Sequence, residues 1–164
     1  MIKSFNNIEP EIDCSVYVSN SADIIGMVKI GKNSSVWYNS VIRGDDQEII
    51  IGENTNIQDG AVLHGDEKTV IGDNVTVGHR AIVHGAKIGN NSLIGMGSIV
   101  LDGAEIGEHC LVGAGSLITS NKKFDSKMLI MGSPAKAVRP LTEEEIKNLD
   151  KSAKLYVEMS KKHK

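Results

Sequence analysis

The sequence is poor in the residues that build large aromatic cores. Among 164 residues there are only 2 Phe, 1 Trp and 3 Tyr, whereas Gly occurs 17 times. Ile and Val take the place of the aromatic residues, and β-branched side chains favour strands. This composition argues against a helical bundle. It favours β-structure with tight corners and small interior positions.

Other scarcities exclude classes of protein. The net charge is only −3, so no basic excess indicates nucleic acid or an anionic membrane surface. No apolar run approaches the roughly 20 residues of a membrane span, and the N-terminus lacks the apolar stretch of a secretory signal. Cys14 and Cys110 stand far apart, in no metal-ligand spacing, and we expect reduced thiols. We therefore expect one cytoplasmic domain over residues 1–164, with no nucleic-acid or membrane partner.

A six-residue repeat runs through most of the chain. The segments IGENTNI, IGDNVTV, IGNNSLI and IGEHCLV are alike. Aliphatic residues recur at this interval, namely Ile12, Val18, Ile24, Ile30, Val36, Ile42, Ile51, Ile57, Leu63, Ile71, Val77, Val83, Ile88, Ile94, Val100, Ile106, Val112 and Ile118. The interval slips to nine after Ile42, eight after Leu63 and five after Val83. A six-residue period predicts an all-β solenoid, with one short strand and one corner per hexapeptide.

We expect the solenoid to end near residue 120 and one C-terminal helix to follow over about 142–162. Thr142 and Glu145 have the spacing of a capping box at the start of a helix. Apolar residues then recur at helical spacing, namely Ile146, Leu149, Ala153, Tyr156 and Val157. The helix should pack along the solenoid, and the tail SKKHK should be a solvated end.

Two histidines hold the same position of their hexapeptides. His64 and His84 each follow an inward aliphatic residue by one, as Arg43 does, and the three lie at intervals of three hexapeptides. In a solenoid with three hexapeptides per coil, which the family resemblance described below implies, Arg43, His64 and His84 form a column whose adjacent coils lie about 4.8 Å apart. Two imidazoles at this spacing can bind one metal ion through bonds of about 2.0–2.1 Å.

A third histidine, His79, belongs to a different face of the expected solenoid. It stands two residues past its inward aliphatic residue, as Asp59 does in the preceding coil. One chain thus offers two ligands on one face and a third on another. Closed three-fold symmetry would unite them, because a heterologous ring places one face of each subunit against a different face of the next. Without such a ring, His64 and His84 are an ordinary surface pair.

Three segments carry a resemblance to a known family: IRGDD (42–46), NIQDGAVLHG (56–65) and VGHRAIVHG (77–85). Together with GMGSIVLDGA, GAGSLI and GSPAK, they resemble the gamma-class carbonic anhydrases, which are hexapeptide-repeat proteins. The resemblance implies a left-handed parallel β-helix with three hexapeptides per coil, hence about six coils over about 12–120. The left hand comes from the resemblance alone, because general crossover rules favour the right hand in about 98% of cases.

The resemblance also implies one divalent metal at each subunit interface of a homotrimer. His64 and His84 would bind it from one chain and His79 from the neighbouring chain. Zinc is the first expectation, with iron and cobalt as alternatives, because imidazole ligands accept all three. Arg43, Asp45 and Asp59 would support the interface and the site. The residues that match further site groups of the family are Asp46, Asn56, Gln58, Glu67 and Tyr156.

The activity implied by the resemblance is hydration of carbon dioxide to bicarbonate. Three neutral imidazoles leave a metal that lowers the pKa of bound water to about 7. Gln58 would hydrogen-bond that water, and Glu67 or Asp46 would carry the released proton away. The archetypal family member has a long acidic loop after its first metal histidine, whereas this chain has only the short GDEK segment. The enzyme is therefore expected to be weak.

Two other functions fit the same sequence. One is a hexapeptide acyltransferase that uses coenzyme A, or a thioesterase that cleaves coenzyme A esters. The other is a metal-stabilised trimeric scaffold without catalysis. One metal ion per chain would argue against the acyltransferase, and hydration above background would argue against the scaffold.

Overall fold

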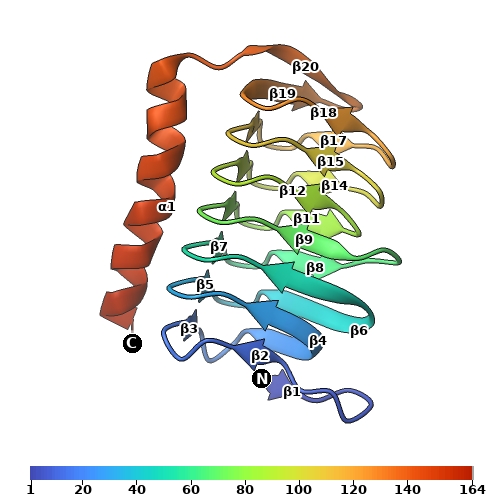
Figure 1. The fold of residues 1–164 in the computed structure, drawn as a ribbon, viewed down its shortest axis with the longest axis vertical. Coiled ribbons are helices and arrows are strands. Elements are labelled where there is room, and N and C mark those ends of the chain that lie inside the picture. The colour runs from blue at the N-terminus through green and yellow to red at the C-terminus, as the bar shows by residue number, and fades with distance from the viewer. Residues whose placement is uncertain (164) are drawn as a thin grey trace.

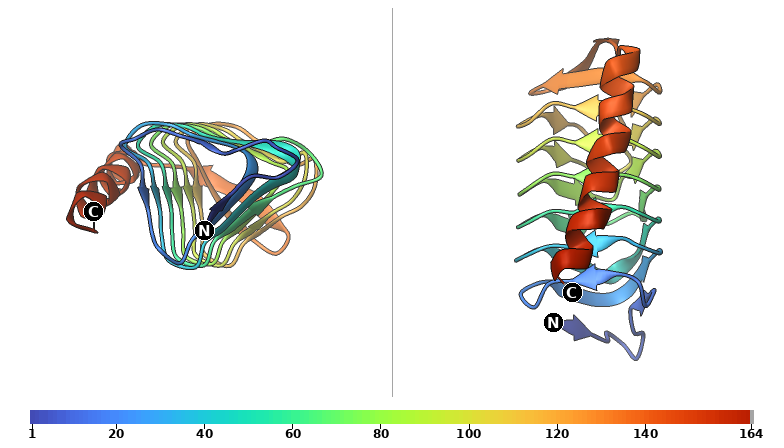
Figure 2. Two further views of the ribbon diagram at one scale, coloured as in Figure 1. Left: turned by 90° about the horizontal axis from the view of Figure 1, so that it is seen from below. Right: turned by 90° about the vertical axis from the view of Figure 1, so that its left-hand side faces the viewer.

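The computed structural model, described for residues 1–163, is a solenoid of short parallel strands with one helix running alongside (Figure 1). Seen along its axis, the solenoid is a three-sided prism (Figure 2). It makes about seven turns and matches a left-handed β-helix. The fold predicted from the six-residue repeat and the family resemblance is thereby confirmed.

The three faces of the prism are built from strands that recur once per turn. The first face consists of β3 (Tyr17–Val18), β5 (Ser35–Val36), β7 (Asn56–Ile57), β10 (Thr76–Val77), β13 (Leu93–Ile94), β16 (Leu111–Val112) and β19 (Met128–Gly132). The second contains the first halves of β4 (Asp23–Ile30) and β6 (Val41–Ile51), then β8 (Val62–His64), β11 (Ile82–His84), β14 (Ile99–Val100) and β17 (Leu117–Ile118). The third contains β2 (Glu11–Ile12), the second halves of β4 and β6, β9 (Thr69–Ile71), β12 (Lys87–Ile88), β15 (Glu105–Ile106) and β18 (Lys123–Phe124). At the two ends, β1 (Ile2–Lys3) pairs with β4, and β20 (Ala135–Pro140) runs antiparallel to β19.

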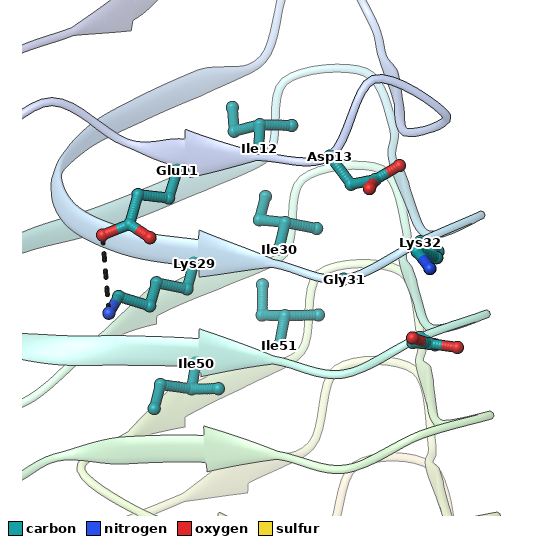
Figure 3. Close-up of a pocket in the computed structure, with 10 residues that line it drawn as sticks. Glu11, Ile12, Asp13, Lys29, Ile30, Gly31, Lys32, Ile50 and Ile51 are labelled. Carbon is teal, nitrogen blue, oxygen red and sulfur yellow. Dashed lines mark ion pairs between the residues drawn. The ribbon is translucent and has the colours of Figure 1, made fainter.

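The core is a set of aliphatic columns, one for each face. Figure 3 shows Ile12, Ile30 and Ile51 stacked on three successive strands of the third face. Alternate side chains of a strand point to opposite sides, so the flanking Glu11 and Lys29 lie outside and form an ion pair of 3.4 Å. A cavity of about 580 Å³ on this face is lined by these residues and contains no histidine. The third face is therefore a solvated, charge-paired surface.

The solenoid extends beyond its expected end near residue 120. The inward column of the third face continues from Ile106 to Phe124, and that of the first face continues from Val112 to Ile130. Phe124 occupies the aliphatic position of the repeat, so a pattern defined by Ile, Val and Leu stops one step too early. Both side chains are buried, which explains why the extra strands are stable.

All three slips of the six-residue interval lie at one corner of the prism, where the second face turns into the third. The nine-residue step is accommodated inside β6, where the pairing with β4 shifts register between Gly26 and Val28. The eight-residue step forms the turn between β8 and β9, and the five-residue step is a tight corner at Gly85, whose φ is +57°. This irregular corner directly follows the positions of Arg43, His64 and His84.

The C-terminal helix α1 spans Glu143–His163, close to the predicted 142–162. Its capping box is formed, since Glu145 accepts a hydrogen bond from Thr142 N at 2.8 Å and donates its own N–H to Thr142 Oγ1 at 3.2 Å. Helix α1 contacts β3, β5 and β7 of the first face. In the tail SKKHK, Lys161, Lys162 and His163 are exposed as expected, whereas Ser160 is buried and Lys164 lies outside the described residues. The exposed ring of His163 contacts Trp37 at a centroid distance of 5.0 Å.

We expect the Glu145→Gln variant to unfold at a lower temperature than the wild type at pH 7, but not at about pH 2. Arg139 and then Thr142 lower the pKa of Glu145 from 4.5 to about 2 in the folded protein. Its stabilisation is therefore complete above pH 4.5 and is lost as the pH falls through about 2. Thermal unfolding followed by circular dichroism measures the difference. Glu144→Gln, outside the Arg139 contact, is the control, and a pH-independent difference would contradict the assignment.

No helix of the described residues is long and apolar enough to cross a membrane. Both cysteines are free thiols, as expected, with Cys14 exposed and Cys110 buried. Burial raises the pKa of the Cys110 thiol, which makes it a poor nucleophile.

Candidate metal centre

His64 and His84 lie side by side on the second face. The parallel register pairs them directly across β8 and β11, as their shared position in the repeat predicts. His64 Nδ1 lies 3.3 Å from His84 Nε2. Two nitrogen atoms bound at about 2.0–2.1 Å to one tetrahedral ion are separated by about 3.3–3.4 Å. The pair therefore has the nitrogen spacing that a shared metal ion requires.

Carboxylates determine which ring nitrogens carry protons. His64 Nε2 lies 3.0 Å from Asp45 Oδ1, and His84 Nδ1 lies 2.6 Å from Asp102 Oδ2. An ionised carboxylate only accepts hydrogen bonds, so the ring nitrogen that faces it carries the proton. In the neutral rings, the two nitrogens that face each other are then both lone pairs. Such an arrangement is repulsive unless a cation lies between them, so the donor set fits a metal ion.

Both carboxyl groups have lowered pKa values. Burial raises the pKa of Asp45, but hydrogen bonds from Arg43 and His64 outweigh burial and bring it below the ordinary value. For Asp102, burial is again opposed by the hydrogen bond and charge of His84 and by backbone N–H groups, and the pKa falls. Arg43 also forms an ion pair with Asp45. Both acids are consequently ionised at neutral pH and able to orient the imidazoles.

His79 lies on the first face, at the corner that follows β10. Its Nδ1 is 2.8 Å from Asp59 Oδ2, so Nε2 is the lone-pair nitrogen of the neutral ring. Both side chains are about two-fifths exposed, at 41% and 42%. Within one chain, residues 1–163 contain no cluster of three or more His, Cys, Asp or Glu side chains suited to a metal ion. A single subunit thus presents the predicted ligands as a pair and a separate third histidine.

Asn56 and Gln58 are buried on the same face as His79. Gln58 Nε2 donates to Asn56 Oδ1 at 3.1 Å, and Asn56 Nδ2 donates to Thr76 Oγ1 at 3.0 Å. Gln58 and His79 also line a groove of about 530 Å³ whose other walls are largely apolar, among them Leu93, Leu111, Leu129 and Met96. The two amides are therefore held in fixed orientations beside an apolar groove.

The remaining predicted site residues lie apart from the histidine pair. Tyr156 on α1 is half-buried against Trp37, and burial followed by the charge of Asp59 raises its pKa. Asp46 is exposed within β6. Glu67 is exposed in the turn between β8 and β9, where it lines a cavity of about 170 Å³ with Lys68 and Lys87. Among the hydrogen bonds of residues 1–163, neither acid is bonded to a histidine.

Asp102 is a site residue that sequence reasoning missed. It lies in the GMGSIVLDGA segment, in the coil above His84, where Val100 pairs with Val83. The only available signal was its position one coil beyond the histidine column. That signal is weak, because the contact depends on the tight corner at Gly85.

Comparisons with known proteins find hexapeptide-repeat proteins and carbonic anhydrases. A family model described as bacterial transferase hexapeptide (six repeats) matches residues 68–97 and 85–120. A carbonic anhydrase of Geobacillus kaustophilus is 44% identical, with coverage of 100% of this chain and 91% of that protein. Gamma carbonic anhydrase 2, mitochondrial, of Arabidopsis thaliana is 43% identical over 94% of this chain, which spans 58% of the plant protein's length. The crystal structure of a hexapeptide transferase family protein from Anaplasma phagocytophilum matches with a TM-score of 0.98 and 45% identity, covering 100% of this chain and 98% of that one.

Fold and repeat together define a hexapeptide-repeat protein of the left-handed β-helix class, with paired histidines on one face. Within that class, the chain belongs to the gamma carbonic anhydrase family.

Proposed function

We propose that this protein is a gamma-class carbonic anhydrase that converts carbon dioxide and water to bicarbonate at sites between the subunits of a homotrimer. The observation that carries the proposal is the pair of facing lone-pair nitrogens on His64 and His84, 3.3 Å apart. His79 of a neighbouring subunit is the third ligand. The relatives named carbonic anhydrase support the reaction.

The trimer is proposed because one chain cannot complete the ligand set. His79 is on the first face of the prism and the histidine pair is on the second. A closed heterologous ring brings these two different faces of adjacent subunits together. The apolar groove beside His79 and Gln58 then lies at the subunit contact, where burial of its leucine and methionine side chains stabilises association.

A divalent ion held by three neutral imidazoles supplies the Lewis acidity that brings the pKa of a water molecule to about 7, and hence a nucleophile for carbon dioxide. Zinc is proposed first, with iron and cobalt as alternatives. Asp45 and Asp59 hold the imidazoles of His64 and His79 in orientation through the contacts described above. The single-domain organisation over 1–164 and the cytoplasmic location are part of the same proposal.

The other site residues have separable roles in this proposal. Gln58 donates its side-chain Nε2–H to Asn56, and the side-chain oxygen Oε1 of Gln58 can accept a hydrogen bond from the reacting water. Glu67 and Asp46 are exposed, so either can exchange a proton with buffer. Tyr156 has a raised pKa and remains a neutral phenol that can donate a hydrogen bond near Asp59.

Acyl transfer from coenzyme A is the second candidate, because the matching family model and the crystallised relative are both described as transferases. Acyl transfer does not require three histidines that bind a metal ion. A thioesterase would use the same three histidines to bind the metal, but its substrate would be a coenzyme A ester. A metal-stabilised trimeric scaffold would bind the ion and have no turnover. These candidates differ in metal content and in hydration of carbon dioxide.

We expect His84→Ala to lose most of its bound metal while its far-ultraviolet circular dichroism remains that of a β-solenoid. The core consists of aliphatic columns, so the fold does not depend on the ion. Protein is prepared anaerobically, loaded separately with zinc or ferrous iron, and measured for metal content and stopped-flow hydration. His109→Asn is the control, since His109 lies at a left-handed corner that Asn tolerates, with φ of +52°. Full metal retention in His84→Ala would refute the ligand assignment.

A further inference from the structure

Each of the three candidate ligands is paired with one carboxylate, and the third carboxylate, Asp102, was not predicted from the sequence. Asp45 faces His64 and Asp59 faces His79, both within the segments that carry the family resemblance. Asp102 faces His84 across a shorter contact, 2.6 Å from Oδ2 to Nδ1. Both side chains of this pair are about three-quarters buried, at 28% and 26% exposure.

The second carboxylate oxygen of Asp102 holds the turn between β8 and β9. Asp102 Oδ1 accepts a hydrogen bond from Asp66 N at 3.1 Å. Asp102 Oδ1 can occupy this position only because residue 85 is glycine. A Cβ atom built on Gly85 would lie 1.9 Å from Asp102 Oδ1 and would collide with it. The corner after His84 is therefore shaped so that one carboxylate contacts both the ring of His84 and the turn that carries Glu67.

At other corners of the solenoid the same backbone contact is made by Asp73 or Asn90, and the side-chain nitrogen of Asn90 donates to Glu108 Oε1 at 3.3 Å. Asp73 Oδ1 accepts a hydrogen bond from Glu53 N at 2.7 Å, and Asn90 Oδ1 accepts one from Asp73 N at 2.8 Å. One acceptor oxygen is sufficient there, so an amide and a carboxylate serve equally. At residue 102 the second polar atom faces His84 Nδ1. An amide nitrogen in that place would donate a proton to the ring nitrogen, where a carboxylate oxygen accepts one.

We propose that Asp102 is a positioning residue that holds His84 in its Nδ1–H form, so that the Nε2 lone pair faces His64, and couples this ring to the turn at 65–68. The metal-binding consequence rests on the proposed function, whereas the proton position on His84 does not. Outer carboxylates of this kind set the orientation and basicity of imidazole ligands, and their loss typically costs about 10–100-fold in metal affinity. Asp102 does not touch the reacting atoms.

The test is the Asp102→Asn variant, compared with the wild type and with Asp73→Asn. Nitrogen-15 NMR of metal-free protein, at a pH where imidazole is neutral, reports which ring nitrogen of His84 carries the proton. We expect Nδ1–H in the wild type and in Asp73→Asn, and Nε2–H in Asp102→Asn. Competition with a chelator should show that zinc affinity falls about 10–100-fold in Asp102→Asn and is unchanged in Asp73→Asn.

An Nε2–H ring in the wild type, or an unchanged Nδ1–H ring in Asp102→Asn, would overturn the inference. The wild-type spectrum decides the question even if the variant does not fold. If the wild type carries Nδ1–H but neither it nor Asp73→Asn binds zinc, the positioning of His84 is upheld and the proposed metal site is refuted. The experiment therefore distinguishes a failure of the positioning role of Asp102 from a failure of the proposed metal site.

Discussion

Subunits carrying His64→Ala and subunits carrying His79→Ala, mixed before assembly, should recover metal binding that neither variant has alone. In the proposed trimer, one subunit contributes His64 and His84, and its neighbour contributes His79. A His79→Ala subunit still has the pair, and a His64→Ala subunit still has the third ligand. Where they meet in that order, one complete site forms. With equal amounts and random mixing, about a quarter of the interfaces in a closed ring are complete.

The matched control mixes His64→Ala with His84→Ala. Both residues lie on the second face of the same chain, paired across β8 and β11, so each interface still lacks one of them. Bound zinc per trimer and stopped-flow hydration are measured on both mixtures after refolding together. Recovery in the control mixture, or none in the first, would show that the histidines do not belong to opposite sides of an interface.

Replacing Gly65 by Ala should destabilise the solenoid by about 3 kcal/mol, the upper end of the usual overpacking cost. A Cβ atom at this position would lie 2.2 Å from Gly85 N and 2.5 Å from Gly85 Cα. Both atoms are backbone, so the neighbouring coil itself has to move. Because Gly65 and Gly85 directly follow His64 and His84, the same movement separates the two rings, and zinc affinity should fall as well.

The control is Gly113→Ala. Its added Cβ atom would meet Met131 Cγ at 2.9 Å, and this flexible side chain can move aside at little cost. Thermal unfolding of the two variants gives the comparison for stability, and chelator competition on Gly65→Ala gives zinc affinity. Equal unfolding temperatures for Gly65→Ala and Gly113→Ala would contradict the close approach of the coils at this corner.

The histidine pair was predictable because the repeat translates sequence position into place on the prism. His64 and His84 occupy the same slot of successive coils, and the parallel register preserves that relation. The capping box at Thr142 and Glu145 was predictable because its contacts are local. The family resemblance supplied the left hand and three hexapeptides per coil, which the six-residue period does not specify.

The extent of the solenoid was only partly predictable. Phe124 and Ile130 continue the inward columns at six-residue steps, but an aromatic residue interrupts an aliphatic pattern. Its fit depends on space at the open end of the stack. Likewise, His163 contacts Trp37 only because α1 runs back along the first face, a path that the spacing of its apolar residues does not define.

The sequence alone determined the inward residues, because they follow from a period repeated many times. Together with the three hexapeptides per coil that the family resemblance implies, it also placed His64 beside His84. The tertiary structure decided the contact between Asp102 and His84 and the hydrogen bond from Asp66 N, in the turn at 65–68, to Asp102. That contact joins residues 18 apart through a corner where the period is broken and Gly85 has φ of +57°. A periodic pattern predicts what recurs, whereas the exceptional corner depends on backbone geometry that only the folded chain specifies.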